Sequence, residues 1–255
     1  MRHNLKDFNF LILIRLDSIQ RLENILAITH SLCMHFDTNI TVLEVAYHYN
    51  GILKSLLNKK INYQFIEDKD PVFYKTRYIN LLLKDVQTPF LSIWDADIVV
   101  DKQNIIAVTS KLQNGLADVA LPYNGTCFEV PEIIRNLYLK NKNIKYLQRN
   151  KSKMNFLHNK TLVGGAVFIR KDKFIMSGMD NEIHYGWGND DFDRFERFKI
   201  LGFEIFRTDN PLFHLFHPRE ANSYYVGLFH TEISTGELAT TMNSSKNEVL
   251  AKRCN

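Results

Sequence analysis

The chain alternates short apolar runs with amphipathic segments, and this alternation constrains its fold more than any other feature. The apolar runs cover residues 10–14, 40–46, 61–66 and 89–94. Each is short and rich in Ile, Leu, Val and Phe, which predicts buried strands. Helices are expected over 18–35, with Ser18 as N-cap, and over 71–86, with Pro71 in the first turn. This pattern predicts an α/β fold with a mostly parallel sheet flanked by helices.

The second half of the chain is less regular. We expect strands over residues 118–121, 163–169 and 203–206. Helices are expected over 104–112 and from Asp191 to about Leu201, where Gly202 can end the helix in a left-handed conformation. Apolar density drops beyond about Asn222, and neither an internal repeat nor an interdomain linker is evident. The sequence therefore predicts one domain over residues 1–222 and a C-terminal tail over 223–255.

Composition excludes several classes of protein. The chain has 255 residues, 45% apolar and 24% charged, which excludes disorder, collagen and coiled coil for its bulk. The net charge of +4 is too mild to indicate a nucleic-acid-binding protein. Three cysteines without a CxxC pair favour a reducing cytoplasm. The apolar run over residues 8–16 is too short to span a bilayer, so we expect no transmembrane segment.

Acidic residues gather where strands are expected to end. The expected edge set is Asp17, Glu44, Asp95 and Asp97. In parallel sheets, ligands bind beyond the carboxyl ends of the strands. The triplet Asp95-Ala96-Asp97 follows an apolar run and precedes another, which favours a divalent cation with a nucleotide. The alternative interpretation is a pair of acids that cap a turn and a helix.

Two histidines follow the last expected strand. His214 and His217 are three residues apart, between Pro211 and Pro218. Such a pair can bind one metal ion from a tight turn or a strand end, and neutral imidazole suits Mn, Zn and Fe better than Mg. Without other motifs, two histidines in an aromatic segment are as readily core or surface residues.

The segment Trp187-Gly188-Asn189-Asp190-Asp191 precedes an expected helix. The helix dipole stabilises ionised acids at this position, and simple capping would explain one of them. It does not explain a Gly-Trp-Gly lead-in. Sugars stack on Trp, and an ionised Asp beside a bound hydroxyl is a candidate general base.

A basic segment lies between the two halves. Residues 140–160 carry seven cations and no acid, namely Lys140, Lys142, Lys145, Arg149, Lys151, Lys153 and Lys160. One interpretation is a solvated helix end and loop. The other is a basic lid or patch that faces phosphates or anionic lipid head groups.

Several of these motifs together resemble the beta-1,4-galactosyltransferases. The Tyr185–Asp193 block is similar to that family's WGWGGEDDD run, and Gly164-Gly165 precedes it as in the family. The segment 214–219 is similar to the family's Met-x-x-His-x-Arg metal segment, and 73–80 to its FNRAKLLN segment. The resemblance covers roughly residues 10–220 in the correct order.

The resemblance implies a GT-A fold, the Rossmann-like fold of nucleotide-diphospho-sugar transferases. It also implies a UDP-sugar donor, Mn²⁺ (or Mg²⁺) and inversion at the anomeric carbon. Asp191 would be the catalytic base, with Asp190 beside it on a sugar hydroxyl. The implied metal ligands are Asp97, His214 and His217. The implied donor- and acceptor-binding residues are Arg15, Asp17, Glu44, Arg77, Asp95, Gly165 and Trp187.

The sequence also departs from the family pattern. His214 stands where the family has its metal-binding Met, which can change the metal preference. Asn189 replaces the second Gly, and Phe192 replaces the third acid of the run. Leu162 replaces an aromatic residue, and the smaller side chain leaves room for a 2-acetamido group. UDP-GalNAc is therefore as open a donor as UDP-Gal.

These features predict a metal-dependent inverting glycosyltransferase that acts on a saccharide hydroxyl. The family's disulfides and membrane anchor are absent, which fits a bacterial cytoplasmic enzyme at the inner membrane face. We expect a role in the synthesis of a surface polysaccharide or lipopolysaccharide. The expected acceptor is a saccharide, either free or linked to a lipid, and no nucleic-acid partner is expected. The alternatives are a sugar nucleotidyltransferase, a sugar-nucleotide hydrolase and a non-catalytic carbohydrate-binding protein.

Overall fold

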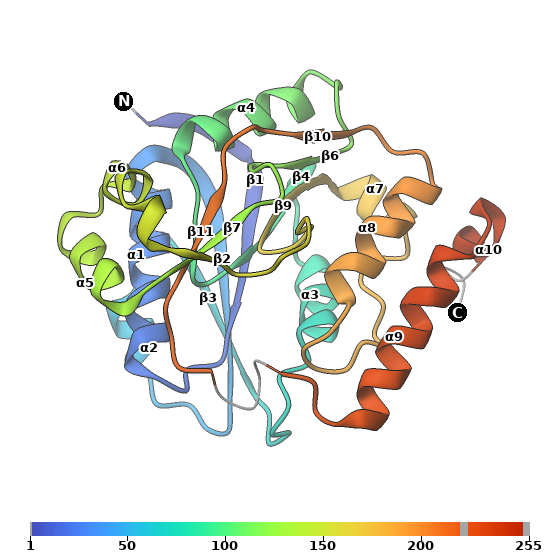
Figure 1. Ribbon diagram of the computed structural model, residues 1–255, viewed down its shortest axis with the longest axis horizontal. Helices are drawn as coiled ribbons and strands as arrows, with labels where there is room; N and C mark the ends of the chain where they lie inside the picture. Colours follow the sequence, from blue (N-terminus) through green and yellow to red (C-terminus); the bar gives the residue numbers. More distant parts are fainter. Residues whose placement is uncertain (1, 220–223, 252–255) are drawn as a thin grey trace.

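The computed structural model describes residues 2–219 and 224–251 and has an α/β architecture (Figure 1). The strands of the central sheet are β1 (His3–Ile14), β2 (Phe36–Ala46), β3 (Asn62–Glu67), β4 (Phe90–Asp95), β6 (Val119–Leu121), β9 (Ala166–Arg170) and β10 (Ile205–Arg207). Their order in the sheet is β10-β6-β9-β4-β1-β2-β3. Strand β9 runs antiparallel to both of its neighbours, and the other pairings are parallel.

A smaller sheet lies beside the first. Its strands are β5 (Ile98–Val99), β7 (Cys127–Val130), β8 (Asn155–Phe156) and β11 (Leu212–Leu215). They are ordered β5-β11-β7-β8. The fold class expected from the sequence, an α/β fold with a mostly parallel mixed sheet flanked by helices, is confirmed.

Helices cover the sheets on both sides (Figure 1). The longer helices are α1 (Ile19–His35), α3 (Lys75–Leu83), α4 (Lys102–Gln113), α5 (Glu132–Asn141), α8 (Asp190–Ile200) and α9 (Leu228–Met242). The shorter helices are α2 (Ile52–Leu56), α6 (Ile144–Arg149), the 3₁₀ turn η1 (Lys151–Lys153), α7 (Lys171–Met176) and α10 (Lys246–Ala251). Within the described ranges, none of these helices has the length and apolar character needed to cross a membrane.

Helix α1 begins and ends as the sequence predicts. The Ser18 side-chain oxygen accepts a hydrogen bond from the backbone N–H of Arg21, which satisfies one of the free donors of the first turn. The helix ends at His35, where Phe36 takes an extended conformation and begins β2.

The bounds predicted for the helix over residues 71–86 are wrong at both ends, because α3 spans only Lys75–Leu83. The Asp70 side chain accepts from the Val72 N–H and holds a local turn, and Arg15 binds the carbonyl oxygens of Asp70 and Pro71 at 2.8 and 2.9 Å. These groups are then no longer available to a helix. At the other end, bonds from residues 84–86 to carbonyls three residues earlier tighten the chain into a turn.

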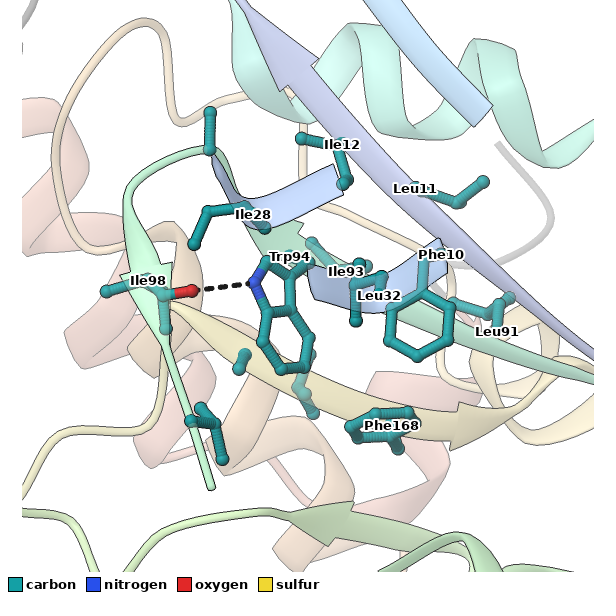
Figure 2. Close-up of a cluster of buried hydrophobic side chains, with 14 of the residues drawn as sticks. Phe10, Leu11, Ile12, Ile28, Leu32, Leu91, Ile93, Trp94, Ile98 and Phe168 are labelled. Carbon is teal, nitrogen blue, oxygen red and sulfur yellow. Dashed lines mark hydrogen bonds between the residues drawn. The ribbon is translucent and has the colours of Figure 1, made fainter. Parts of the chain in front are cut away.

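An aromatic cluster under β1 and β4 fixes the position of the central strands (Figure 2). The buried ring of Phe168 packs edge-on against Phe8, Phe10 and Trp94, with centroids 5.4–6.0 Å apart. The Trp94 indole N–H donates to the carbonyl oxygen of Ile98 at 3.1 Å. This bond closes the turn that carries Asp95 and Asp97, so the core directly positions the acidic pair.

The segment expected as a tail contains α9 and α10. Helix α9 packs beside α8, where the Thr241 hydroxyl donates to Asp193 at 2.6 Å, and Val249 of α10 is buried. The domain boundary expected at 222/223 falls outside the described residues, as does Cys254, so the division of the chain stays a prediction.

We expect Phe168→Ala to lower the free energy of unfolding by about 3–5 kcal/mol, because it leaves a cavity among three other aromatic rings. Urea unfolding monitored by circular dichroism measures this change. Phe229→Ala is the matched control, because its ring is 68% exposed, and it should change stability by less than about 0.5 kcal/mol. Equal losses in both variants would contradict this account of the core.

Candidate active site

A cavity of about 370 Å³ opens beyond the carboxyl end of β4. It is formed by segments far apart in the sequence, including the start of α3, the turn after β4, the residues before β9 and the start of α8. Six of the residues expected at a site line it, namely Asp95, Gly165, Trp187, Asp190, Asp191 and His214. The structure therefore brings these residues to one place, although their chemical roles stay predictions.

Two cations neutralise the carboxylates of this cavity. Lys75 Nζ lies 2.8 Å from Asp95 Oδ1 and 4.0 Å from Asp191 Oδ2. On the other side, Arg194 Nη1 lies 2.8 Å from Asp191 Oδ1. The second terminal nitrogen of Arg194 donates to Asp180 at 3.1 Å, so this guanidinium is itself held in place. Asp191 thus lies between two fixed positive charges.

The two neighbouring aspartates differ in protonation. Burial alone would raise the pKa of Asp191, but Lys75 and Arg194 outweigh it and lower the pKa below its ordinary 3.8. Burial and the adjacent charge of Asp191 raise the pKa of Asp190 to about 7. Asp190 Oδ2 is buried without a hydrogen-bond partner among the described residues. Asp191 can therefore accept a proton at neutral pH, and Asp190 can bind a polar ligand group.

Glycines allow the chain to pass very close to Asp191. A Cβ atom on Gly164 would lie 1.8 Å from Asp191 Oδ2, so a larger residue cannot occupy this position without moving the carboxylate. The Tyr123 hydroxyl donates to the Gly164 carbonyl oxygen at 2.6 Å. Gly165, with φ of +81°, follows in the left-handed region that favours glycine. The presence of two glycines next to Asp191, the candidate base, thus has a steric explanation.

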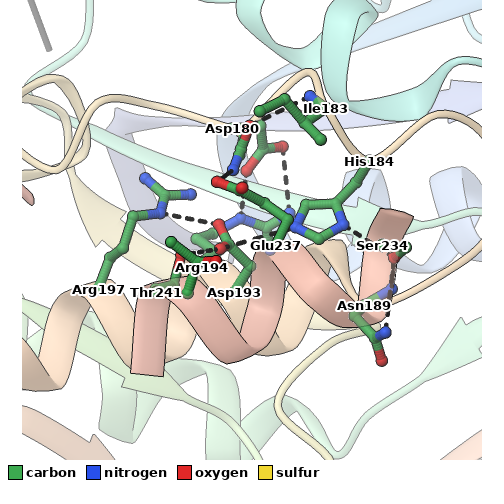
Figure 3. A network of polar contacts seen from close by, with 12 residues as sticks. Asp180, Ile183, His184, Asn189, Asp193, Arg194, Arg197, Ser234, Glu237 and Thr241 are labelled. Carbon is green, nitrogen blue, oxygen red and sulfur yellow. Dashed lines mark hydrogen bonds and ion pairs between the residues drawn. The ribbon is translucent and has the colours of Figure 1, made fainter. Parts of the chain in front are cut away.

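A buried polar network supports the loop that carries Trp187 (Figure 3). Ser234 Oγ of α9 accepts from the Asn189 N–H at 3.2 Å and lies 2.9 Å from His184 Nδ1. Asp193 continues the network through Arg197 Nε at 2.9 Å. Burial opposes its ionisation, but hydrogen bonds and charge from His184 and Arg197 lower the pKa of Asp193 to about 2.

This network positions the loop and performs no chemistry of its own. His184 and Asp193 are fully buried and Ser234 nearly so, and a Cβ on Gly188 would lie 2.8 Å from Ser234 Oγ. No substrate can therefore reach the serine hydroxyl without displacing the loop. Trp187 itself is 40% exposed and meets Tyr225 edge-on at 5.1 Å, so one indole face is available to a ligand.

Asp97, His214 and His217 form a candidate metal centre next to the cavity. Each offers one ligand atom, and these atoms lie within 4.8 Å of one another. The Nε2 atoms of His214 and His217 lie 3.7 and 3.3 Å from the Asp97 carboxylate. His217 Nδ1 lies 2.7 Å from the Pro218 carbonyl oxygen, so Nδ1 carries the proton and Nε2 is free to ligate.

The electrostatics of this group also fit a cation. Burial would raise the pKa of Asp97, but His214, His217 and Arg21 hold it well below its usual range. Burial lowers the pKa of His214, which keeps its imidazole neutral as metal binding requires. Two nitrogens and one carboxylate oxygen are a donor set that suits Mn²⁺, Zn²⁺ or Fe²⁺.

The four residues expected around the nucleotide occupy different environments. The Asp17 carboxylate forms an ion pair with Arg21, whose Nε lies 3.0 Å from Asp17 Oδ1. Nη1 of the same arginine lies 4.0 Å from Asp97 Oδ2. Arg15 is bound to backbone carbonyl oxygens, as described above. Glu44 lies within β2, two residues before its end, and accepts from the Tyr63 hydroxyl at 2.6 Å. Arg77 lines a separate cavity of about 840 Å³. Their roles toward a nucleotide stay predictions.

Sequence reasoning missed Lys75 and Arg194. The sequence does carry a signal for Lys75, because this residue lies in the 73–80 segment that resembles the family. It stands two residues before Arg77, which is expected to bind the nucleotide. Arg194 lies three residues after Asp191, the spacing that places both on one face of a helix. Buried acids require counter-charges, which is a reason to look for such cations.

Basic residues also line the cavity. Lys160 Nζ lies over the Phe192 ring at 4.3 Å, and His158 and Arg219 line the same cavity. Arg219 Nη2 pairs with Glu129 Oε1 at 3.3 Å. Burial, Arg219 and Lys160 lower the pKa of His158. Of the basic segment over 140–160, Lys160 is thus the residue that reaches this cavity.

We expect Asp97→Asn and His217→Gln to weaken Mn²⁺ binding at least about tenfold, because each removes a candidate ligand. Isothermal titration of the apoprotein with MnCl₂ measures the affinity. The exposed pair Asp209→Asn and His48→Gln repeats the same substitutions elsewhere and should bind Mn²⁺ as the parent does. Unchanged affinity in the first two variants would exclude this metal centre.

We expect Asp190→Asn to become stabilising relative to the parent as pH rises from 4 to 7. Below pH 3.8 the carboxyl is protonated in both states, but above it the unfolded chain ionises while the folded chain keeps its proton up to about pH 7. The folded state then binds more protons, so parent stability falls with pH, by about 2–4 kcal/mol for a shift of this size. Urea unfolding at pH 4 and 7.5 measures the free energy of unfolding of the variant and the parent. A stability difference between them that does not change with pH would contradict this prediction.

Part of the chain matches a known protein family. Residues 147–220 match a family model described as the N-terminal domain of galactosyltransferase. This segment contains Gly164-Gly165, the Trp187–Asp191 loop and both histidines of the metal centre. No curated protein matches the chain.

Among solved structures, the chain is similar to the catalytic domain of Drosophila beta1,4-galactosyltransferase 7 in complex with xylobiose. The identity is 15% and the TM-score is 0.44. The match covers 80% of this chain and 64% of that protein. The family match over residues 147–220 supports a glycosyltransferase.

Proposed function

We propose that this protein is a metal-dependent inverting glycosyltransferase that moves galactose or N-acetylgalactosamine from a UDP-sugar to a saccharide hydroxyl. One observation carries the proposal. Asp191 is a partly buried, ionised carboxylate on the wall of a cavity, between Lys75 and Arg194, and a candidate metal centre of three donors lies beside it. This is the charge arrangement that a base and a diphosphate leaving group require.

The donor half of the site lies at the carboxyl end of β4. Asp97, His214 and His217 would hold Mn²⁺, which the imidazoles favour over Mg²⁺. When bound, a divalent cation neutralises negative charge on the departing diphosphate. Asp95 and its partner Lys75 face the same space and would orient the donor. Leu162 also lines the cavity, and its modest size supports either galactose or N-acetylgalactosamine.

The acceptor half is formed by the start of α8 and the loop before it. Trp187 would stack on a sugar ring, and Asp190 would hydrogen-bond a sugar hydroxyl. Asp191 would take the proton of the acceptor hydroxyl while its oxygen bonds to the anomeric carbon. The bond from that carbon to the diphosphate oxygen breaks on the opposite face, so one displacement inverts the centre. Alignment of both sugars in one cavity would supply several kcal/mol of the barrier reduction, about 7–11 at most.

The cellular role follows from the earlier expectations. A bacterial enzyme at the cytoplasmic face of the inner membrane, which adds a sugar to a surface polysaccharide or lipopolysaccharide precursor, fits the basic residues that line the cavity. A precursor that carries a lipid diphosphate is one acceptor of this kind.

We expect Mn²⁺-dependent release of UDP from UDP-Gal or UDP-GalNAc, and a 10²–10⁴-fold lower turnover in Asp191→Asn with UDP binding retained. A screen of UDP-sugars for UDP release, followed by mass spectrometry with candidate acceptors, measures the first. Calorimetry with UDP and Mn²⁺ measures the second.

Asp209→Asn is the matched control for this experiment and should keep parental turnover. Near-normal turnover in Asp191→Asn would remove Asp191 from the role of base. Release of pyrophosphate in place of UDP would identify a nucleotidyltransferase. Binding of free sugar without affinity for UDP would identify a carbohydrate-binding protein.

A further inference from the structure

A third cavity, of about 760 Å³, lies between the end of α1 and the turn from α5 to α6. Its rim is basic and its floor is apolar, with Leu32, Trp94 and Ile105 among the floor residues. The basic residues that line it are His30, His35, Lys102, Lys142 and Lys145. Ile98 lines both this cavity and the candidate active site, so the two lie on opposite sides of β5.

The charge around this cavity is strongly one-sided. No Asp or Glu occurs in residues 133–171. The exposed cations here are Lys140, Lys142, Lys145, Arg149, Lys151 and Lys153. Asp101 does line the cavity, but its carboxylate caps α4 at the Gln103 N–H and accepts from Gln148. Among residues 2–219 and 224–251, Lys102, Lys142 and Lys145 form no ion pair, so their charge is available to a ligand.

The backbone at Lys142 is a second and independent observation. This residue ends α5 with φ of +49° and ψ of +31°, in the left-handed region. This conformation is energetically unfavourable for a residue with a Cβ atom, and glycine or asparagine is the usual residue there. Lys142 therefore occupies a position that favours glycine, and it also lines the cavity.

Exposed apolar side chains indicate what kind of anion this surface meets. Met34 lines the cavity and is 60% exposed. On α5, Ile133 and Leu137 are 76% and 39% exposed and stand two turns and one turn before Asn141, which also lines the cavity. A soluble phosphate would need the cations alone. Cations together with protruding apolar side chains match a membrane surface.

We propose that this surface binds an anionic phospholipid bilayer, with a lipid phosphate in the cavity against Lys102, Lys142 and Lys145 and with Met34, Ile133 and Leu137 in the headgroup region. The remaining cations of 140–153 would meet further headgroups by charge alone. This proposal does not depend on the reaction assigned to the candidate active site.

Vesicle co-sedimentation tests the proposal with the full chain. We expect binding to vesicles of 30% phosphatidylglycerol in phosphatidylcholine, loss of binding at high salt, and little binding to phosphatidylcholine alone. Lys142→Glu with Lys145→Glu should weaken binding at least tenfold. Lys199→Glu with Lys246→Glu is the matched control, because it makes the same charge change on α8 and α10 and should keep binding within about threefold.

A glycine variant separates charge from folding. Lys142→Gly relieves the left-handed backbone, so it should keep or raise the melting temperature and still lose severalfold in vesicle binding, whereas Lys142→Arg should retain binding. The proposal is overturned if the parent protein does not bind anionic vesicles at low salt, even if it binds inorganic phosphate. It is equally overturned if both double variants lose binding alike, or if Lys142→Gly binds as the parent does.

Discussion

Three carboxylates line one cavity, and the two cations that neutralise Asp95 and Asp191 hold together the parts of the chain that form it. A partly buried ionised group without a partner would be destabilising, so Asp95 and Asp191 need partners at fixed distances. Lys75 supplies one from the first turn of α3, and Arg194 supplies the other from α8 itself. Strand β4, α3 and α8 are therefore held in register by charge balance as well as by packing.

The surrounding structure maintains this balance. The Trp94–Ile98 hydrogen bond closes the turn between Asp95 and Asp97, and Gly164 leaves room for the Asp191 carboxylate. Arg194 is also fixed by Asp180, and the Asp193 network reaches α9 through Thr241. The C-terminal helices thus brace the loop that carries Trp187, which explains why polar residues such as His184 and Ser234 are buried there.

Local patterns predicted the elements well, and contacts distant in sequence account for the errors. The apolar runs at 10–14 and 89–94 became β1 and β4 because burial on both faces is visible in composition. The start of α3 moved because Arg15, about 55 residues away, takes the Asp70 and Pro71 carbonyl oxygens. The antiparallel direction of β9 and the docking of α9 depend on tertiary pairing that no local pattern contains. For the site, strand ends indicated Asp95 and Asp97, whereas the pairing of Asp97 with histidines about 120 residues later was expected through the family resemblance.

The ionisation of Asp191 tests the central claim most directly. Carbon-13 NMR of the protein with labelled aspartate carboxyls, assigned by comparison with Asp191→Asn, follows this group through a pH titration. We expect the Asp191 carboxyl to remain ionised down to below pH 3.8, its ordinary value, because Lys75 and Arg194 face it. An Asp191 carboxyl that takes up its proton above pH 3.8 would show that Lys75 and Arg194 do not outweigh its burial, and that result would contradict the account.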